Sequence, residues 1–250
     1  MTASSTTSNP RQFKRVILKL SGEALREDGS QDNISPEIVE RIAREIREAK
    51  ESSDVELGIV CGGGNFWRGA SASARGMDRA TADHVGMLAT VMNALALQAA
   101  LEAEGCECVV QSAIEMQNVA EPFIRRKAAH QLSCGKIVIF AAGTGSPFFS
   151  TDTTAALRAN EMAADVIFKA TQVDGVYSAD PRTNPDAERF EEVTFERCIK
   201  DNLGVMDTTA FTLCQDNNVP IIIFDLGEFG NIQKALAGEN IGTLVKKATA

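Results

Sequence analysis

The sequence has only two histidines and no pair of cysteines spaced as Cys-x-x-Cys. A structural zinc site needs four such ligands held together, so these absences argue against a zinc protein. The six cysteines are scattered, mostly in or beside apolar stretches, which favours buried free thiols over disulfides. Because free thiols are typical of a reducing compartment, we expect the protein to be cytoplasmic. The sequence does not identify protein ligands for a metal.

Several common active-site motifs are also missing. The chain contains no G-x-x-x-x-G-K-[ST], no G-x-G-x-x-G, no His-Arg-Asp or Asp-Phe-Gly, and no G-x-S-x-G. These absences argue against a P-loop enzyme, a dinucleotide-binding domain, a protein kinase and an α/β-hydrolase. A Ser-His-Asp hydrolase would have to use His84 or His130, and both fit a helix surface or a core position better.

Positive charge is in short supply, with 25 Lys and Arg against 34 Asp and Glu, a formal net charge of −9. Such a field repels polyanions, so we expect no nucleic-acid partner, although a local cationic pocket remains possible. No apolar run suggests a membrane span, and we expect no membrane partner. The first ten residues are rich in Ser and Thr and lack the apolar core of a signal peptide. We expect residues 1–12 to be a disordered tail and residues 13–250 to form a single domain.

What the sequence does contain is an alternation of short apolar runs with longer helical patterns. The runs are uninterrupted and rich in β-branched residues, as in strands that are buried on both faces of a parallel sheet. They cover residues 16–20, 57–61, 108–111, 137–141, 166–168 and 221–224. Ser35 and Pro36 are a typical helix start, and a long helix is expected over residues 78–104. Other helices are expected near residues 122–132, 153–162, 208–217 and 231–237. The pattern predicts an α/β fold with a mostly parallel sheet.

The segments that follow these strands carry the candidate chemistry, because ligands of such sheets bind beyond the carboxyl ends of the strands. Lys19 ends the first strand and is followed by Ser21 and Gly22, a group that can hold phosphate oxygens or can be an ordinary turn. Three glycines, residues 62–64, follow the second strand. They permit a backbone to approach an anion closely, with Arg68 nearby as a bidentate donor, although a flexible surface loop is the alternative.

Six ordered motifs closely resemble the amino-acid kinase family and, within it, the uridylate (UMP) kinases. They are KLSGEAL at 19–25, GGGNFWRG at 62–69, ADHVGMLATVMNALAL at 82–97, GTGSPFFSTD at 143–152, KATQVDGVYSADP at 169–181 and VMDTTAF at 205–211. The resemblance implies an αβα sandwich with a mostly parallel central sheet, assembled as a homohexamer. It also implies transfer of the γ-phosphoryl group of Mg-ATP to UMP in pyrimidine nucleotide biosynthesis, with Mg²⁺ as the cofactor.

The resemblance also assigns roles to residues. The implied catalytic residues are Lys19, Lys169, Asp152 and Arg68. The implied ATP-binding residues are Lys19, Ser21, Gly22, Gly64, Arg68, Thr171, Tyr177 and Asp180. The implied UMP-binding residues are Gly63, Arg68, Asp83, Thr144, Gly145, Ser146, Pro147, Phe148, Phe149, Ser150 and Thr151. Asp207 lies in a matching motif, and it could serve either the active site or the start of a helix.

The chemistry of such a transfer agrees with the scarcity of histidine. A phosphate monoester has its second pKa near ~6, so the attacking acceptor is already an oxyanion and needs no general base. Two alternatives remain open at this stage: an amino-acid or carbamate kinase of the same fold, and a non-catalytic protein that binds or stores nucleotides or oxyanions. The polar segment of residues 26–33 differs from the glycine-rich stretch associated with GTP activation in some relatives, so GTP regulation is not predicted.

Overall fold

The computed structural model describes residues 12–27, 29–181, 183–184 and 186–248. Nine strands from along this chain form one sheet in the order β4-β3-β5-β2-β1-β6-β10-β11-β9. All neighbouring pairs are parallel except β10 and β11. The strands are β1 (Arg15–Leu20), β2 (Glu56–Cys61), β3 (Cys108–Ser112), β4 (Glu121–Pro122), β5 (Ile137–Ala141), β6 (Val166–Thr171), β9 (Glu192–Thr194), β10 (Ile221–Asp225) and β11 (Thr243–Lys246). A separate antiparallel pair consists of β7 (Val176–Tyr177) and β8 (Arg189–Phe190).

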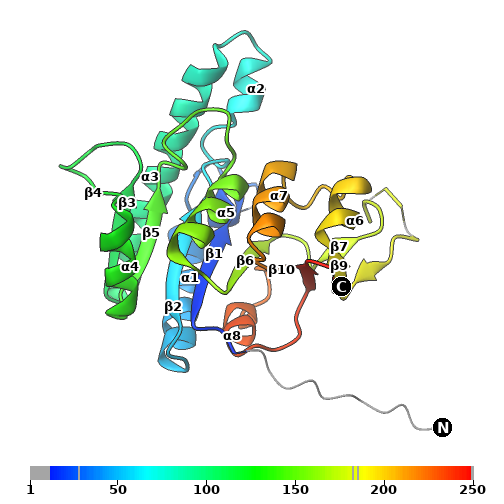
Figure 1. The fold of residues 1–250 in the computed structure, drawn as a ribbon. Coiled ribbons are helices and arrows are strands. Elements are labelled where there is room, and N and C mark those ends of the chain that lie inside the picture. The colour runs from blue at the N-terminus through cyan, green and yellow to red at the C-terminus, as the bar shows by residue number, and fades with distance from the viewer. Residues whose placement is uncertain (1–11, 28, 182, 185, 249–250) are drawn as a thin grey trace.

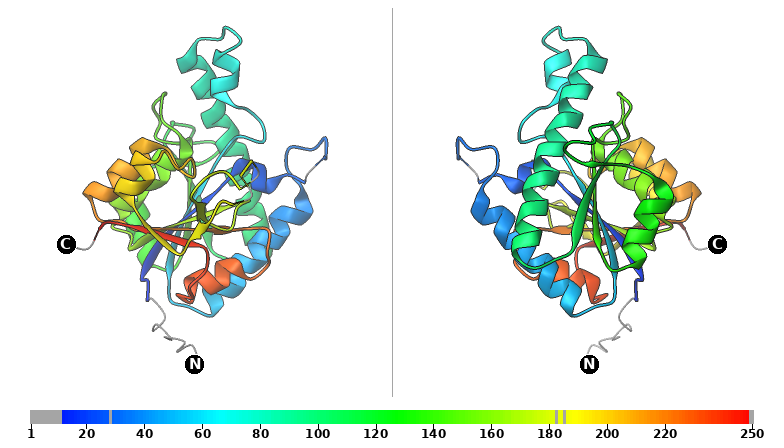
Figure 2. Two further views of the ribbon diagram at one scale, coloured as in Figure 1. Left: turned by 90° about the vertical axis from the view of Figure 1, so that its right-hand side faces the viewer. Right: turned by 90° about the vertical axis from the view of Figure 1, so that its left-hand side faces the viewer.

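Helices cover both faces of this sheet, which confirms the predicted αβα sandwich (Figure 1). One face packs against α1 (Pro36–Glu51), α3 (Arg79–Ala103) and α8 (Asn231–Leu236). The other packs against α4 (Arg125–Ser133), α5 (Thr151–Met162), α6 (Phe195–Lys200) and α7 (Thr208–Asp216). The short helices η1 (Gly22–Leu25) and α2 (Gly69–Ser73) follow β1 and β2. Figure 2 shows that α2 and the beginning of α3 project together from the body of the molecule.

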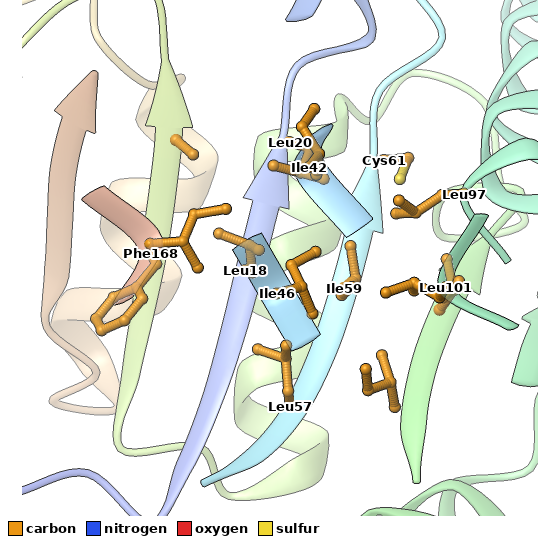
Figure 3. Close-up of a cluster of buried hydrophobic side chains, with 14 of the residues drawn as sticks. Leu18, Leu20, Ile42, Ile46, Leu57, Ile59, Cys61, Leu97, Leu101 and Phe168 are labelled. Atoms are coloured by element: carbon orange, nitrogen blue, oxygen red, sulfur yellow. The ribbon is translucent and has the colours of Figure 1, made fainter. Parts of the chain in front are cut away.

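The two hydrophobic cores follow from the alternation of side chains along each strand. In β1, Leu18 and Leu20 lie in the core under α1 and α3, whereas Ile17 lies in the core on the opposite face. Figure 3 shows the first of these cores, where Ile46 of α1 and Leu101 of α3 meet the strands. A central strand that is apolar on both faces can be stable only between two helical layers, so the sequence of β1 itself specifies the sandwich.

The six predicted strands are all present, each within three residues of its expected end. All six cysteines are free as predicted, but only Cys61, Cys198 and Cys214 are buried, and Cys134 is exposed. Helix α5 begins at Thr151, two residues earlier than expected, so the end of the GTGSPFFSTD motif lies inside the helix. The short strands β4, β7, β8, β9 and β11 were not predicted. The predicted tail falls on residues 1–12, of which only Gln12 is among the described residues.

Helix α3 requires a correction to the expectation that no segment suggests a membrane span. By length and composition alone, this helix is long and apolar enough to cross a membrane, and no other helix in the described part of the chain is. Half of its most apolar window is buried inside the protein, where Leu97 and Leu101 pack against the sheet. A mostly buried core helix passes the same test, so a single such helix is weak evidence for a membrane span.

Candidate active site

Two cavities open at the edge of the sheet where β1, β2, β5 and β6 end. The first, which we call the glycine-loop cavity, has a volume of about 580 Å³ and is lined by Gly63, Gly64 and Arg68 together with residues of α3 and of the segment before α5. The second, the lysine cavity, has a volume of about 660 Å³ and is lined by Lys19, Lys169 and the segment around Tyr177. Each volume is within the usual range of small-ligand sites.

A buried cluster of three charged side chains lies at this edge. Lys19 of β1 and Lys169 of β6 are paired across the two adjacent strands, and each is only 7% exposed. Asp152 of α5 bridges them, with Oδ1 2.9 Å from Lys19 Nζ and Oδ2 2.6 Å from Lys169 Nζ. Lys169 Nζ also donates a hydrogen bond to the backbone carbonyl oxygen of Val205. Two buried ammonium groups thus share one carboxylate, which leaves an excess of one positive charge beside the lysine cavity.

Burial and the neighbouring charges act in opposite directions on these groups. Burial alone would raise the pKa of Asp152, but the ammonium groups of Lys19 and Lys169 hold it below its ordinary value. Burial lowers the pKa of Lys169, and repulsion from Lys19 lowers it further, while Asp152 acts in the opposite direction. Asp152 is therefore ionised at neutral pH, and Lys169 loses its proton more readily than an ordinary lysine.

This displaced pKa predicts an alkaline limb in the pH profile of activity. The sequence predicts a catalytic role for Lys169, and if its protonated form acts there, activity is expected at neutral pH and is lost as the pH rises through a pKa below the ordinary 10.5. We expect kcat, measured at saturating substrates from neutral pH upward, to fall with a midpoint under 10.5. Circular dichroism at each pH must show the folded protein, and a flat profile up to 10.5 would be inconsistent with this role of Lys169.

The glycine loop after β2 forms one wall of the glycine-loop cavity and packs tightly on its surroundings. A side chain at Gly63 would lie 2.8 Å from the carbonyl oxygen of Gly86, and one at Gly22 would lie 2.7 Å from the backbone nitrogen of Gly64. Contacts this close exclude a Cβ at both positions, so Gly63 lets the glycine loop approach α3 and Gly22 lets the segment after β1 approach the glycine loop. Trp67 Nε1 donates a hydrogen bond of 2.9 Å to the carbonyl oxygen of Ala82, which fastens the loop to α3.

A buried pair of asparagines connects this loop to α3 by hydrogen bonds. Asn65 and Asn93 exchange amide hydrogen bonds of 2.9 and 2.8 Å, and Asn93 is fully buried in α3. Asn93 Nδ2 also donates to the carbonyl oxygen of Gly62 at 2.7 Å, and Asn65 Nδ2 donates to the carbonyl oxygen of Asn33. Neither asparagine was predicted from the sequence to be part of the site. A satisfied buried network of this kind fixes the backbone that it contacts, so we interpret Asn93 as a residue that positions the glycine loop.

Replacing Asn93 with leucine tests that interpretation. The change leaves Gly62 and Asn65 without their buried partner, and we expect a loss of about 1–3 kcal/mol in unfolding free energy. Because the loop is no longer fixed, we also expect kcat/KM to fall by about 10-fold or more in a steady-state assay. Leu97→Ala is the matched control: it is buried one turn further along α3, and we expect it to cost about 2–5 kcal/mol while kcat/KM is retained. Equal kinetic losses in the two variants would contradict a specific role for Asn93.

The N-termini of α5 and α7 meet at Asp207. Its carboxylate accepts hydrogen bonds from the hydroxyl of Ser150, from Thr153 Oγ1 at 3.0 Å and from the backbone N–H of Ala210 at 2.9 Å. Asp207 is therefore the N-cap of α7, and it also lines the glycine-loop cavity. Ser150 is the N-cap of α5. The N-terminus of α5 beside this cavity favours an anionic ligand, whereas the carboxylate of Asp207 already satisfies the N-terminus of α7.

Most of the residues predicted to bind UMP line the same cavity. Nine of them line the glycine-loop cavity: Gly63, Arg68, Asp83, Thr144, Ser146, Phe148, Phe149, Ser150 and Thr151. Gly145 and Pro147 belong to the same loop but do not line the cavity. Asp83 accepts a hydrogen bond of 2.8 Å from the backbone N–H of Phe148 and is paired with Arg79 at 2.9 Å, so it joins α3 to this loop.

The residues predicted to bind ATP or to be catalytic are divided between the two cavities. Lys19, Ser21, Lys169, Thr171, Tyr177 and Asp180 line the lysine cavity. Gly64 and Arg68 instead line the glycine-loop cavity, and Gly22 is buried against the glycine loop. Tyr177 donates a hydrogen bond of 2.7 Å from its hydroxyl to Asp174 Oδ1, which raises the pKa of Tyr177.

Known proteins share both the sequence pattern and the fold. Residues 14–225 match the model of the amino acid kinase family. The chain belongs to the amino-acid kinase family. Kinases of this family are phosphotransferases.

Three solved structures of this family are similar to the chain. UMP kinase from Bacillus anthracis is 39% identical, with a TM-score of 0.91 over 96% of this chain and 98% of the other. UMP kinase from Ureaplasma parvum is 36% identical, with a TM-score of 0.88 over 95% and 100% of the two chains. Uridylate kinase from Archaeoglobus fulgidus is 28% identical, with a TM-score of 0.70 over 92% and 99%.

Proposed function

We propose that this member of the amino-acid kinase family is a UMP kinase, which transfers the γ-phosphoryl group of Mg-ATP to UMP and gives UDP and ADP. The observation that carries the proposal is the pair of cavities at one edge of the sheet, with the Lys19–Asp152–Lys169 cluster beside them. A kinase for a nucleoside monophosphate needs two such sites, because two nucleotides must be held with their phosphates facing each other. The similarity to UMP kinases over nearly the whole chain supports uridylate as the acceptor.

UMP is assigned to the glycine-loop cavity. Its phosphate would lie against Gly63 and the guanidinium of Arg68, both of which line that cavity. The carboxylate of Asp83 would accept hydrogen bonds from the ribose hydroxyls, and the loop from Thr144 to Thr151 would surround the base. ATP is assigned to the lysine cavity, with the base near Tyr177 and the phosphates toward Lys19 and Lys169.

The chemical task in this arrangement is to overcome repulsion between two polyanions. The acceptor phosphate is already ionised near neutral pH, so the residues have no proton to remove. Lys19 and Lys169 neutralise charge that develops on the transferred phosphoryl group. Asp152 holds the two ammonium groups at fixed positions through its two ion pairs. Arg68 and the N-terminus of α5 align the acceptor phosphate.

The residues present fit a magnesium ion that arrives bound to ATP. Among the described residues, no group of three or more His, Cys, Asp or Glu could hold a metal ion. Mg²⁺ typically uses one or two carboxylates with substrate phosphates and waters, so a dedicated cage is not required. Asp152 is the candidate carboxylate, because it lies beside Lys19 and Lys169, which line the lysine cavity, and its two oxygens are paired with these lysines. When bound, the ion supplies further neutralisation of phosphate charge.

The proposal extends to assembly and location. We propose a cytoplasmic homohexamer that contains no nucleic acid and no membrane segment. Helix α3 presents Leu88 and Met92 to solvent, 50% and 45% exposed, one turn apart on the same side of the helix. A second copy of the chain would cover this apolar face.

The experiment that tests the function is a coupled ADP-release assay of the purified protein with Mg-ATP. UMP, carbamate, aspartate, glutamate and acetylglutamate are offered as acceptors in parallel. We expect turnover with UMP and none with the others. Turnover with one of the other acceptors but not with UMP would instead identify an amino-acid or carbamate kinase. Binding of ATP and UMP without turnover would favour a nucleotide-binding or storage protein.

A further inference from the structure

The guanidinium of Arg68 is paired with a carboxylate of the protein itself, that of Glu23. Its Nη2 and Nε donate hydrogen bonds of 2.6 and 3.2 Å to the same carboxylate oxygen, Oε1 of Glu23. Glu23 lies in η1, three residues after the end of β1, and thus belongs to the loop that carries Ser21 and Gly22. A guanidinium holds a single phosphate oxygen with the same two-donor geometry.

The carboxylate of Glu23 also lies over the glycine loop. A methyl group placed on Gly64 would be 3.5 Å from Glu23 Oε1 and 3.9 Å from Arg68 Nε. Gly64 and Arg68 both line the glycine-loop cavity. The negative charge of Glu23 therefore lies beside Gly64 and the Arg68 guanidinium, a position that is also suited to a phosphate.

This contact is one that a phosphate can displace. The side chains of Arg68 and Glu23 are 65% and 31% exposed, and ion pairs at such exposed positions contribute little stability. A phosphate monoester carries about −1.5 to −2 charges at pH 7 and offers three acceptor oxygens, compared with one charge and two oxygens for a carboxylate. While the carboxylate stays in place, it repels the incoming phosphate.

We propose that Glu23 is a resident competitor of the acceptor phosphate for Arg68 and so sets the affinity of the glycine-loop cavity for its substrate. This inference rests on the proposed function, because it takes the phosphate of UMP as the ligand of Arg68. Glu23 occupies Arg68 in the free protein and leaves it when the phosphate binds.

The test compares UMP and uridine binding by isothermal titration calorimetry at low ionic strength. Glu23→Gln keeps the size of the side chain and removes its charge, so we expect the Kd for UMP to fall by about 3- to 10-fold. The Kd for uridine, which has no phosphate, should not change. The gain for UMP should shrink as salt is added, because screening weakens the repulsion that the substitution removes.

Two further variants make the comparison specific. Glu27→Gln removes an equal charge from an exposed position four residues further along the chain, and we expect it to leave the Kd for UMP unchanged. Glu23→Ala removes the carboxylate without offering an amide, and it must act in the same direction as Glu23→Gln. Each variant is first shown to be folded by circular dichroism and thermal unfolding.

The outcomes separate this inference from the proposed function. If the unmodified protein binds UMP but removal of the Glu23 charge leaves the Kd for UMP unchanged or raises it, Glu23 is not a competitor and the inference is wrong. An equal gain for UMP and uridine would also overturn it, because the effect would not involve the phosphate. If the unmodified protein binds no UMP at all, the proposed function itself fails.

Discussion

Replacing Asp152 with asparagine is expected to lower kcat by at least about 100-fold, the scale of losing one strong transition-state contact. Asparagine has nearly the same shape, so the change mainly removes the one negative charge between Lys19 and Lys169. The two ammonium groups then repel each other in a buried site, and the loss of Asp152 removes the group that supports the protonated form of Lys169. We therefore also expect the alkaline limb of the kcat profile to move to lower pH.

The measurement is a steady-state assay across pH, on protein shown to be folded. Asp54→Asn is the matched control, since Asp54 is exposed and precedes β2, at the end of the strand remote from the cavities. The control should keep the kcat and the pH profile of the unmodified protein. Near-normal turnover by the Asp152→Asn protein would remove this carboxylate from the mechanism.

Replacing Lys169 with alanine is the second large effect, again a fall in kcat of at least about 100-fold. Lys169 lines the lysine cavity and not the glycine-loop cavity, so the loss should appear in the chemical step rather than in acceptor binding. We expect the Kd for UMP, measured by calorimetry, to remain close to that of the unmodified protein. The substitution also removes the hydrogen bond to the carbonyl oxygen of Val205, which ties β6 to the segment before α7.

Lys136→Ala serves as the control for loss of a positive charge. Lys136 is paired with Glu107 and its side chain is 42% exposed, and it does not line either cavity. This variant should keep its full kcat. If Lys169→Ala weakened UMP binding strongly and left kcat intact, the assignment of Lys169 to the transferred phosphate would be wrong.

The fold could be predicted from the sequence because its central strands are simple. Runs such as 137–141 and 221–224 are apolar without interruption, and only strands covered on both faces are stable with that pattern. The strands that were missed are short or lie toward one edge of the sheet. In β11, Leu244 is only partly buried while Val245 is fully buried, so this four-residue strand lacks the continuous apolar run. Its antiparallel pairing with β10 depends on tertiary contacts that no local pattern encodes.

The sequence predicts which residues lie near the site but not which of them contact one another. Loops after parallel strands converge at one edge, and that geometry brings Lys19 and Arg68 to the same edge of the molecule. That Lys19 lies beside Lys169 depends on β1 and β6 being neighbours in the sheet, which the sequence does not specify. Glu23 and Asn93 lie within two of the six motifs, but the motifs do not give their contacts with Arg68 and with the glycine loop. They appear only when separate segments pack together.

The central claim is that the two cavities hold two nucleotides with their phosphates facing each other at the Lys19–Asp152–Lys169 cluster. A crystal structure with UMP and the magnesium complex of a non-hydrolysable ATP analogue tests it most directly. We predict the UMP phosphate against Gly63 and Arg68, the γ-phosphate beside Lys19 and Lys169, and the attacking oxygen about 3–3.5 Å from the γ-phosphorus. Nucleotides bound on separate surfaces, or phosphates pointing away from the lysines, would contradict the account.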